Sequence, residues 1–431
     1  MVLPLSKSCL ELATAWYLRS SDFKGLPLSD IGAALKCGWH ALGEAVIALV
    51  EDKRAAVLWE KATINPHINR LGFPDGRTQI EYLRSLKDYP DHACLYPAEE
   101  HLRDVVDHAM YHGRPYELEM ALGEPQLSFR VFNVHVLETY RNDPRYTYDS
   151  SDISGSISIS DEHFESGKVP ESDQVLLESF GFAYDDALNR GVAVYLRYLA
   201  NLSPEHQQIW KARGLPRGYK LHPDYYRSSI LGEFPERVSM FTAFCKELWL
   251  VNRMCRAMGR DPLFLKDFGD NAEQRPKKFA FLLRPTLEEY NAFVLLFDKL
   301  LSDNISHKFF GNDVSHDEES ETGDGRIEVR RKGTIRILDE WVRKYFKAEE
   351  LSVWEEAVAS FKEIRHARQK PAHAIDEDRF DSQLIKDQRV LVQKGYNAVR
   401  SIRLILENHP SVKSAAIEVP DWLREGRIWT L

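Results

Sequence analysis

The sequence predicts a mainly α-helical protein that contains a small β element and ends in a bundle of helices. Three observations support this fold class. Apolar residues recur at spacings of three and four along most of the chain, as between Ile31 and Leu49, which is typical of amphipathic helices. Apolar and polar residues alternate between positions 125 and 166, which indicates strands. Four helical patterns follow one another between positions 276 and 410, and such a series favours a bundle.

The composition is that of an ordinary soluble protein. The chain has 431 residues, of which 43% are hydrophobic and 29% are charged, enough for two or three domains. The start of the sequence lacks the basic and apolar regions of a signal peptide, and no apolar stretch approaches the roughly 18–20 residues of a membrane span. The five cysteines are scattered without a CxxC pair, which indicates reduced thiols. We therefore expect a cytoplasmic protein that does not enter a membrane.

The net charge limits the size of any nucleic-acid interface. Proteins that bind nucleic acid without selectivity are usually basic overall, whereas this chain has a formal net charge of -9. A large nucleic-acid interface is therefore disfavoured, while a local basic groove stays compatible with the composition.

The sequence divides into four parts. A polar, charged stretch from Gly269 to Lys278 is the predicted boundary before the last large domain. The parts are a helical region at 1–124, a mixed region at 125–275 with the β element and then helices, a helical bundle at 276–410 and a tail at 411–431. In the mixed region, helices are expected to resume near residue 171 and continue to Leu199. A long helix is expected from Val238 to Met258, with Gly259 as its C-cap.

One group of polar residues in the N-terminal region has the spacing of metal ligands. Asp104, His108 and His112 fall four residues apart and would share one face of a predicted helix. Three such ligands could begin a metal site. A polar surface face with an Asp–His pair is the commoner explanation of this pattern, and we predict no metal and no other cofactor.

The segment from Lys211 to Arg227 combines cations with tyrosines. Cations can contact phosphates and aromatic rings can stack on unpaired bases, so this segment is the best candidate for RNA contact outside the C-terminal region. The alternative, which we favour, is a loop whose tyrosines cover the neighbouring core. The candidate residues are Lys211, Arg213, Arg217, Tyr219, Lys220, His222, Tyr225, Tyr226 and Arg227.

The C-terminal bundle is predicted to contain four helices. The first begins at Thr286, because Thr286 and Glu289 fit a capping box. A polar stretch from Gly311 to Gly333 follows, with an acidic half expected to be mobile and a basic half expected to form a short ribbon. The second helix is predicted from Thr334 to Phe346, the third carries the motif described next, and the fourth is predicted from Ser382 to Asn408.

The third helix of this bundle changes character along one face. Apolar residues recur along one face of this helix, and the same helical spacing continues onto Arg365 and Arg368. This face is therefore apolar at the start of the helix and positively charged at its end. Pro371 lacks a backbone N–H and disfavours the α conformation at the residue before it, which predicts that the helix ends near Gln369. His373 then follows just beyond the helix end, close to a permanently charged arginine.

This arrangement resembles the ribonucleases of the HEPN superfamily (higher eukaryotes and prokaryotes nucleotide-binding). These enzymes carry an arginine and, after a short gap, a histidine where the last two helices of a bundle meet. Arg368 and His373 match this motif with four residues between them. The family usually has Asn, Asp or His directly after the arginine, where this chain has Gln369. Arg365 is followed by the more typical His366, but seven residues lie between Arg365 and His373, so we take Arg368 as the match.

The resemblance implies a metal-independent endoribonuclease, in which the 2′-hydroxyl of RNA attacks the adjacent phosphate. Arg368 and His373 would be catalytic, with Arg365, Glu363 and His366 in support, and Glu363 would orient the Arg368 guanidinium. HEPN ribonucleases typically pair two Arg–His sets across a dimer, which implies a homodimer. Many are bacterial toxins or anti-phage defence effectors. This implies regulation by the N-terminal region, with an antitoxin, an activator or a phage trigger as partner.

The residues also allow a non-catalytic interpretation. The arginines could pair with Glu363, Asp376 or Glu377, and His373 could cap the end of the third helix, where a cation is favoured. The chain would then be a non-catalytic HEPN-like scaffold that binds nucleotide, RNA or a protein partner through the same basic end.

Overall fold

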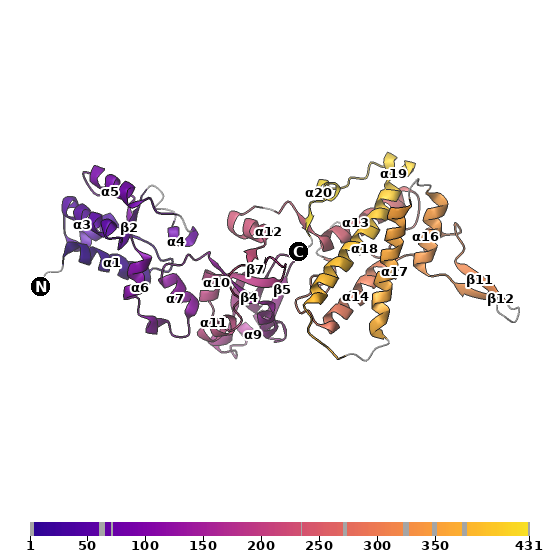
Figure 1. Ribbon diagram of the computed structural model, residues 1–431, viewed down its shortest axis with the longest axis horizontal. Coiled ribbons are helices and arrows are strands. Elements are labelled where there is room, and N and C mark those ends of the chain that lie inside the picture. Colours follow the sequence, from indigo (N-terminus) through magenta and orange to yellow (C-terminus); the bar gives the residue numbers. More distant parts are fainter. Residues whose placement is uncertain are drawn as a thin grey trace. The chain divides into compact units, whose positions relative to one another are not determined.

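The chain forms two compact units, Met1–Tyr225 and Tyr226–Leu431. The computed structural model describes residues 4–59, 65–69, 72–233, 235–269, 274–321, 327–346, 351–372 and 377–429. Helices predominate in both units, and each unit also contains strands (Figure 1). The predicted mixture of helices with a smaller share of strands is confirmed at this level.

The first unit begins with helices packed against a small sheet. The predicted single helix from Ile31 to Leu49 is wrong, because Lys36 adopts a left-handed conformation (φ 50°) and separates two helices. No single described helix is long and apolar enough to cross a bilayer, and α2 and α3 pass that test only as a pair bent by 117°. The elements are α1 (Leu5–Arg19), β1 (Leu26–Pro27), α2 (Leu28–Leu35), α3 (Trp39–Glu51), β2 (Ala55–Leu58), α4 (Pro66–Asn69), α5 (Gly76–Ser85) and β3 (Cys94–Pro97), with strand order β1-β3-β2.

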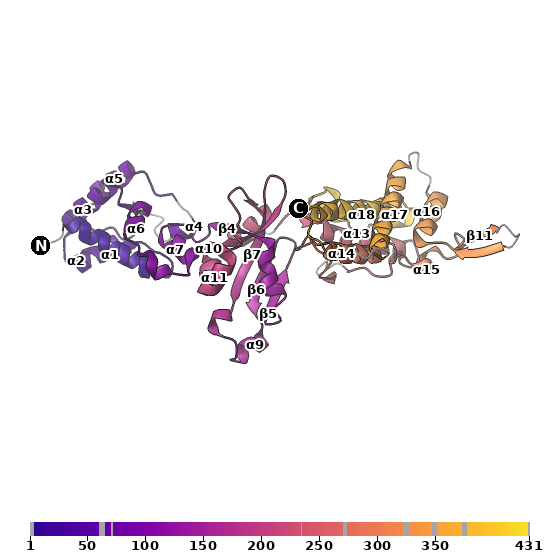
Figure 2. The ribbon, with the colours of Figure 1, turned by 60° about the horizontal axis from the view of Figure 1, so that its bottom comes forward.

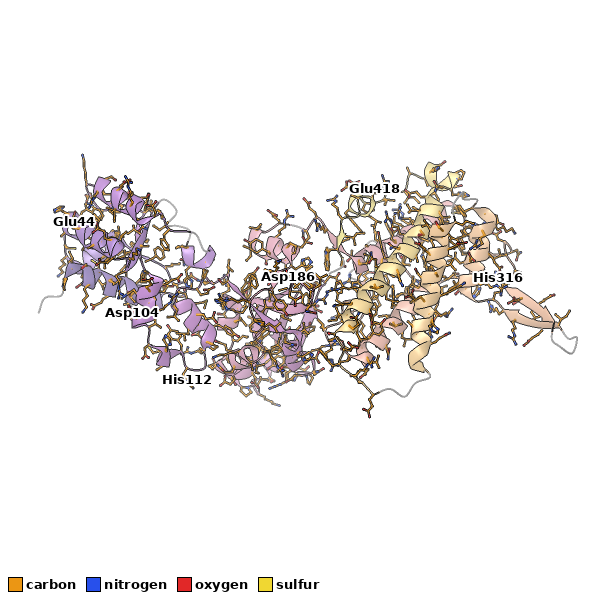
Figure 3. All side chains as sticks on the ribbon, viewed as in Figure 1. Glu44, Asp104, His112, Asp186, His316 and Glu418 are labelled. Atoms are coloured by element: carbon orange, nitrogen blue, oxygen red, sulfur yellow. The ribbon has the colours of Figure 1, made fainter. Side chains whose placement is uncertain are left out.

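The candidate metal ligands of this region do not share a helix. The helix α6 (Glu99–Val105) ends one residue after Asp104, and a 3-10 turn, η1 (His108–Tyr111), leads to α7 (Pro115–Ala121). Figure 3 labels Asp104 and His112, which belong to these different segments. Asp104 instead pairs with Arg54 at 2.9 Å. Among the described residues, no group of His, Cys, Asp and Glu could hold a metal ion.

A six-stranded antiparallel sheet forms the second half of the first unit. Its order is β4-β8-β7-β6-β5, and β9 pairs with β7. The strands are β4 (Phe129–Asn133), β5 (Tyr146–Ser150), β6 (Ser154–Ile159), β7 (Leu176–Tyr184), β8 (Arg190–Tyr195) and β9 (Lys220–Leu221). The short helices and turns around it are η2 (Val134–Leu137), α8 (Glu138–Arg141), α9 (Asp161–Glu165), η3 (Glu171–Asp173), α10 (Leu196–Ala200), α11 (Pro204–Lys211) and α12 (Pro223–Tyr226).

The sheet is larger than predicted, because the stretch expected to be helical from residue 171 to Leu199 supplies the strands β7 and β8. Every residue of β8 is buried. A strand buried on both faces shows a continuous apolar run instead of alternation, and such a run also fits helical spacing. Only α10, at the end of this stretch, is helical as expected.

The second unit has one hydrophobic core to which all of its main helices contribute. The helices α13, α14, α17 and α18 contribute to this core, and α18 packs against the other three. Figure 1 shows α14, α17 and α18 running alongside one another. The main helices of this unit are α13 (Met240–Ala257), α14 (Leu287–Leu301), α16 (Thr334–Tyr345), α17 (Ser352–Ala372) and α18 (Gln383–Glu407). Since α13 belongs to this unit, the division of the chain differs from the boundary expected near residue 275.

The C-terminal tail folds back onto the same unit. Strand β13 (Ile428–Trp429) pairs in parallel with β10 (Val238–Ser239), which leads directly into α13. The Trp429 ring also stacks on the Phe281 ring, with their centroids 5.8 Å apart. The remaining elements of the unit are η4 (Arg227–Leu231), α15 (His307–Phe310), β11 (Asp317–Glu321), β12 (Ile327–Arg331), α19 (Pro410–Ser414) and α20 (Asp421–Arg424).

Several predicted helix ends are confirmed by their caps. The Thr286 hydroxyl accepts a hydrogen bond from the Glu289 N–H at 3.3 Å, which is one of the two bonds of a capping box. The Glu289 carboxylate accepts a hydrogen bond from the Arg284 N–H, just before the helix. Gly259 follows α13 with a left-handed φ of 72°. A close approach also fixes the packing of α18, because a Cβ at Gly395 would lie 2.3 Å from Cζ of Phe297 on α14.

The polar excursion before α16 forms a hairpin. Strands β11 and β12 pair in antiparallel register, and Figure 2 shows this ribbon extending from the helices of its unit. The acidic half was expected to be mobile, and its residues Asp317–Glu321 form the strand β11. Asp317 faces Arg331 and Glu318 faces Arg330 across the ribbon, and the Glu318 carboxylate pairs with Arg336 of α16 at 2.5 Å.

A buried ion pair joins α13 to α18. Arg403 donates from Nε to the Glu247 carboxylate at 2.5 Å, and both side chains are almost fully buried. Arg403 also donates to Glu407 at 2.8 Å, so its guanidinium keeps a carboxylate partner when Glu247 is neutral. Burial raises the pKa of Glu247 to about 7, because the cost of desolvation exceeds the attraction of Arg403.

The stability of the protein is expected to depend on pH through Glu247. The folded state keeps the Glu247 proton up to about pH 7, whereas the unfolded chain releases it near pH 4.5. Raising the pH through this window therefore favours the unfolded state, by up to about 3 kcal/mol. In urea unfolding, the wild type should have a lower free energy of unfolding at pH 8 than at pH 5. The same change in pH should lower the free energy of unfolding of Glu247→Gln much less. Glu356→Gln, at an exposed position of α17, serves as the control and should lose as much stability as the wild type, and equal losses in the wild type and Glu247→Gln would contradict the prediction.

Candidate functional site

The end of α17 carries two arginines on one face. Arg365 and Arg368 lie one turn apart, and both reach the end of α14, where Asp298 and Asp303 accept their hydrogen bonds. Arg368 Nη1 lies 2.7 Å from Asp298 Oδ2 and 2.6 Å from Asp303 Oδ2. Arg365 Nη2 lies 2.6 Å from Asp303 Oδ1. Two guanidinium groups and two carboxylates therefore form one cluster, named the Arg–Asp cluster below.

The two aspartates of the Arg–Asp cluster differ in burial. The Asp298 side chain, in the last turn of α14, is 0% exposed, whereas the Asp303 side chain, just past the helix end, is 35% exposed. A buried carboxylate requires positive partners, and Arg368 is the nearest one. Hydrogen bonds to both aspartates raise the pKa of Arg368. Asp298 thus anchors the arginine from the interior, and Asp303 closes the cluster at the surface.

The guanidinium of Arg368 is only partly occupied by these contacts. Both of its hydrogen bonds to described residues leave from Nη1. An arginine carries five N–H donors, so the N–H groups on Nε and Nη2 face no acceptor among the described residues. The cluster therefore holds Arg368 in a fixed position and leaves part of its donor edge for another anion.

The helix that carries the arginines is longer than predicted. The expected end near Gln369 is wrong, because α17 continues through Pro371 to Ala372. A proline removes one backbone donor, and near the last turn this is the loss of a single helical hydrogen bond. His373 lies outside the described residues.

The supporting residues predicted around the arginines have other roles. Glu363 was expected to orient Arg368, but its carboxylate pairs with Lys394 of α18 at 2.6 Å. His366 is exposed on a different face of α17. Of the acidic partners considered for the arginines, Asp376 lies outside the described residues, and neither Glu363 nor Glu377 bonds to them among the described contacts.

The sequence interpretation missed Asp298 and Asp303. A signal was present for the first of them, because Asp298 follows Val294 by four residues on the apolar face of its helix. A carboxylate on an inward face is rare unless it is paired. Its pairing with a cation from another helix could have been expected, although not the identity of that cation.

In the first unit, the tyrosines of the segment from Lys211 to Arg227 mostly cover the core. Tyr225 is 2% exposed, its hydroxyl lies 3.0 Å from that of Ser179, and its ring stacks on Tyr195. Tyr219 packs against the apolar face of the sheet, and His222 is buried. These side chains are therefore not placed to stack on a base.

The cations of that segment are distributed over its surface. Lys220 pairs with Asp186 at 2.8 Å, and Arg227 pairs with Glu233 at 2.7 Å. The structure places the other exposed members at the surface of the segment, namely Lys211, Arg213, Arg217 and Tyr226. The alternative that this segment covers the core explains the positions of its buried tyrosines. Under the RNA-contact hypothesis, only these exposed side chains remain available to contact RNA.

Asp298 is expected to matter more for stability than Asp303. Replacing the buried Asp298 by Asn leaves the Arg368 guanidinium without its interior carboxylate and should reduce the free energy of unfolding by about 1–3 kcal/mol. Asp303→Asn removes a partly exposed partner and should cost less than about 1 kcal/mol. Urea denaturation of both variants measures the difference, and an equal or reversed order would show that Asp298 is not the anchor.

Comparison of the sequence with protein-family models found no match, and comparisons with curated proteins and with solved structures found none either. The functional assignment of the Arg–Asp cluster therefore rests on its own residues and geometry.

Proposed function

We propose that this chain is a metal-independent endoribonuclease of the HEPN type, with Arg368 and His373 as its catalytic residues. The observation that carries the proposal is the partly occupied guanidinium of Arg368, which Asp298 and Asp303 hold in place. An arginine fixed before the substrate arrives can stabilise charge that develops in a transition state without further reorganisation.

The proposed chemistry uses the nucleophile that RNA itself carries. A base removes the proton of the 2′-hydroxyl, O2′ bonds to phosphorus, and the bond from phosphorus to O5′ breaks as O5′ takes a proton. An imidazole with a pKa near neutrality suits the transfer of a proton, which is the role proposed for His373. A planar guanidinium suits the crowded, negatively charged phosphate, which is the role proposed for Arg368. The products would be a 2′,3′-cyclic phosphate and a 5′-hydroxyl.

The helical core of the second unit supports this assignment. The arginines lie at the end of α17, which packs between α14 and α18, and the expected site lies where the chain passes from α17 to α18. We propose that α14, α17 and α18, together with α13, correspond to a HEPN-like bundle. The first unit would then regulate the bundle in response to an antitoxin, an activator or a phage trigger, as in a bacterial toxin or a defence effector.

A homodimer would place two such sites together, and one surface suits this role. A groove of about 460 Å³ runs between α17 and α18 over small side chains such as Ala357 and Ser401. Two large apolar residues at its margin, Val353 and Leu404, are 60% and 43% exposed. We propose that a second copy packs here, because a two-fold axis brings the same groove of each copy against the other.

A non-catalytic scaffold is the second candidate function. It is favoured by the charge balance of the Arg–Asp cluster, in which two aspartates offset the two arginines. Without net positive charge, the cluster attracts a polyanion less strongly. The protein would then bind nucleotide, RNA or a protein partner through this end without cutting it.

Cleavage of RNA by the purified protein distinguishes these candidates. We expect wild-type protein to cut total RNA in EDTA, and Arg368→Ala to lower the rate by about 10²–10³-fold. His373→Ala should lower it by about 10²–10⁴-fold. Arg424→Ala, an exposed arginine on α20, should cut like the wild type. Binding of RNA without cleavage by wild-type protein, with or without a cell extract as a source of activator, would favour the scaffold instead.

The dimer proposal has its own test in the groove. Val353→Glu and Leu404→Glu place charge on the apolar margin, and the paired variant should sediment as a monomer in analytical ultracentrifugation where the wild type sediments as a dimer. Leu295→Glu, at an exposed apolar position of α14, should leave the wild-type sedimentation unchanged. A groove variant that stays dimeric, or a wild type that is monomeric at all concentrations, would rule out this interface.

A further inference from the structure

A second polar site lies beside the Arg–Asp cluster. An open pocket of about 580 Å³ is formed by the loop after α14, the start of α15, the turn between β12 and α16, and the side chain of Arg365 on α17. The polar residues on its wall come from three separate stretches of the second unit. They are Asp303, Ser306, His307, Lys308, Lys332 and Thr334, in addition to Arg365.

The charge on the pocket wall is net positive. Lys308, Lys332 and Arg365 are cations, against the single carboxylate of Asp303. Lys308 is exposed and forms no ion pair with a described residue. Lys332 is held in place by Glu340, with 2.7 Å between nitrogen and oxygen, and its side chain is only 11% exposed. A positive, partly enclosed site on a chain with a net charge of -9 concentrates anions locally.

The pocket also offers a hydrogen-bond donor without charge. The Ser306 side chain is buried, and its oxygen accepts the backbone N–H of Lys308 at 3.2 Å. The hydroxyl hydrogen of Ser306 finds no acceptor among the described residues. The other hydroxyl, on Thr334, is already used, because it donates to the Ser302 carbonyl at 2.8 Å. Ser306 thus adds a neutral donor to the cations around it.

The protonation of His307 is expected to change when an anion binds in the pocket. Its Nδ1 atom is buried and has no partner among the described residues. Its ring centroid lies 5.4 Å from that of His316, which Figure 3 labels near the hairpin. Burial, together with the nearby charges of Arg331 and His316, lowers the pKa of His307. An anion in the pocket would reverse this effect, because an opposite charge favours the protonated imidazole.

We propose that this pocket binds a backbone phosphate of single-stranded RNA, next to the arginines that act on the phosphate to be cleaved. Lys308, Lys332 and Arg365 supply charge, and Ser306 donates a hydrogen bond to a phosphate oxygen. The choice of RNA as ligand rests on the proposed function, whereas the recognition of a phosphate rests on the pocket itself. The pocket would set the position of the strand relative to Arg368.

Lys308 provides the sharpest test, because it forms no ion pair with a described residue. The full-length protein is titrated with a 2′-O-methyl RNA oligonucleotide, which lacks the attacking hydroxyl and cannot be cut by the proposed route. Fluorescence anisotropy at two salt concentrations should show about five- to tenfold weaker binding by Lys308→Ala, and a salt dependence reduced by about one phosphate contact. Lys413→Ala, an exposed lysine on α19, should bind like the wild type. Unchanged affinity in Lys308→Ala and in Lys332→Gln would overturn the proposal.

His307 gives a second readout in the same assay. Wild-type affinity for the oligonucleotide should rise as the pH falls from 8 to 6, because binding and protonation of His307 favour each other. His307→Gln should lose most of this rise, while His92→Gln, at an exposed position of the first unit, should keep it. Identical pH profiles of the wild type and His307→Gln would remove His307 from the site.

The two proposals can fail separately. If wild-type protein cuts RNA while Lys308→Ala binds the oligonucleotide as the wild type does, the phosphate pocket is wrong and the ribonuclease proposal stands. If no protein cuts RNA but binding depends on Lys308, the pocket stands within a non-catalytic scaffold. If the wild type does not bind the oligonucleotide at all, the pocket is not an RNA site.

Discussion

The buried carboxylate of Asp298 is the constraint on which the C-terminal site depends. A carboxylate with no exposed side-chain surface is costly unless cations meet it, and Lys299 in the last turn of α14 is exposed and does not pair with it. The cation comes from α17, where Arg368 bonds to it at 2.7 Å. This requirement fixes which turn of α17 lies beside the end of α14, and it thereby fixes where both arginines lie. The position of the site therefore follows from the pairing of a buried carboxylate with a cation, and no substrate is needed to set it.

The same interaction gives the site two opposite properties. Paired carboxylates order the guanidinium groups, which is useful for catalysis because less reorganisation is needed. They also offset the positive charge that would attract RNA. The adjacent pocket resolves this conflict, since Lys308, which forms no ion pair with a described residue, adds charge that the Arg–Asp cluster lacks. Attraction of the strand and stabilisation of the reacting phosphate are then assigned to neighbouring but different side chains.

Local signals in the sequence predicted part of this structure. The ends of α16 and α18, the Thr286 cap and the turn at Gly259 depend on residues close in sequence, and these predictions are confirmed. The strands β7 and β8 were missed, because β8 and the second half of β7 are buried on both faces, which removes the alternation by which strands are identified. The helix break at Lys36 was also missed, although Gly38 lies in it as the N-cap of α3.

The arginines of the candidate site could be predicted from the sequence, but the aspartates that pair with them could not. Arg365 and Arg368 stand out because they interrupt an apolar face. Their partners lie far away in sequence, with 70 positions between Arg368 and Asp298, and no local pattern links residues at that separation. Only the packing of α14 against α17 brings them together, and that packing is a property of the whole helical core. The pocket around His307 likewise draws its polar residues from three separate stretches, which only the fold brings together.

The close approach at Gly395 has a consequence for recognising related chains. Any side chain there would collide with Phe297, and Phe297 immediately precedes the anchoring aspartate. A chain that keeps the same crossing of α14 and α18 should therefore keep an aromatic–Asp pair on one helix, two arginines three residues apart on the next long helix, and a glycine on the last. Such a sparse signature could survive long after overall similarity has been lost, and it would identify distant members by the geometry that they must share.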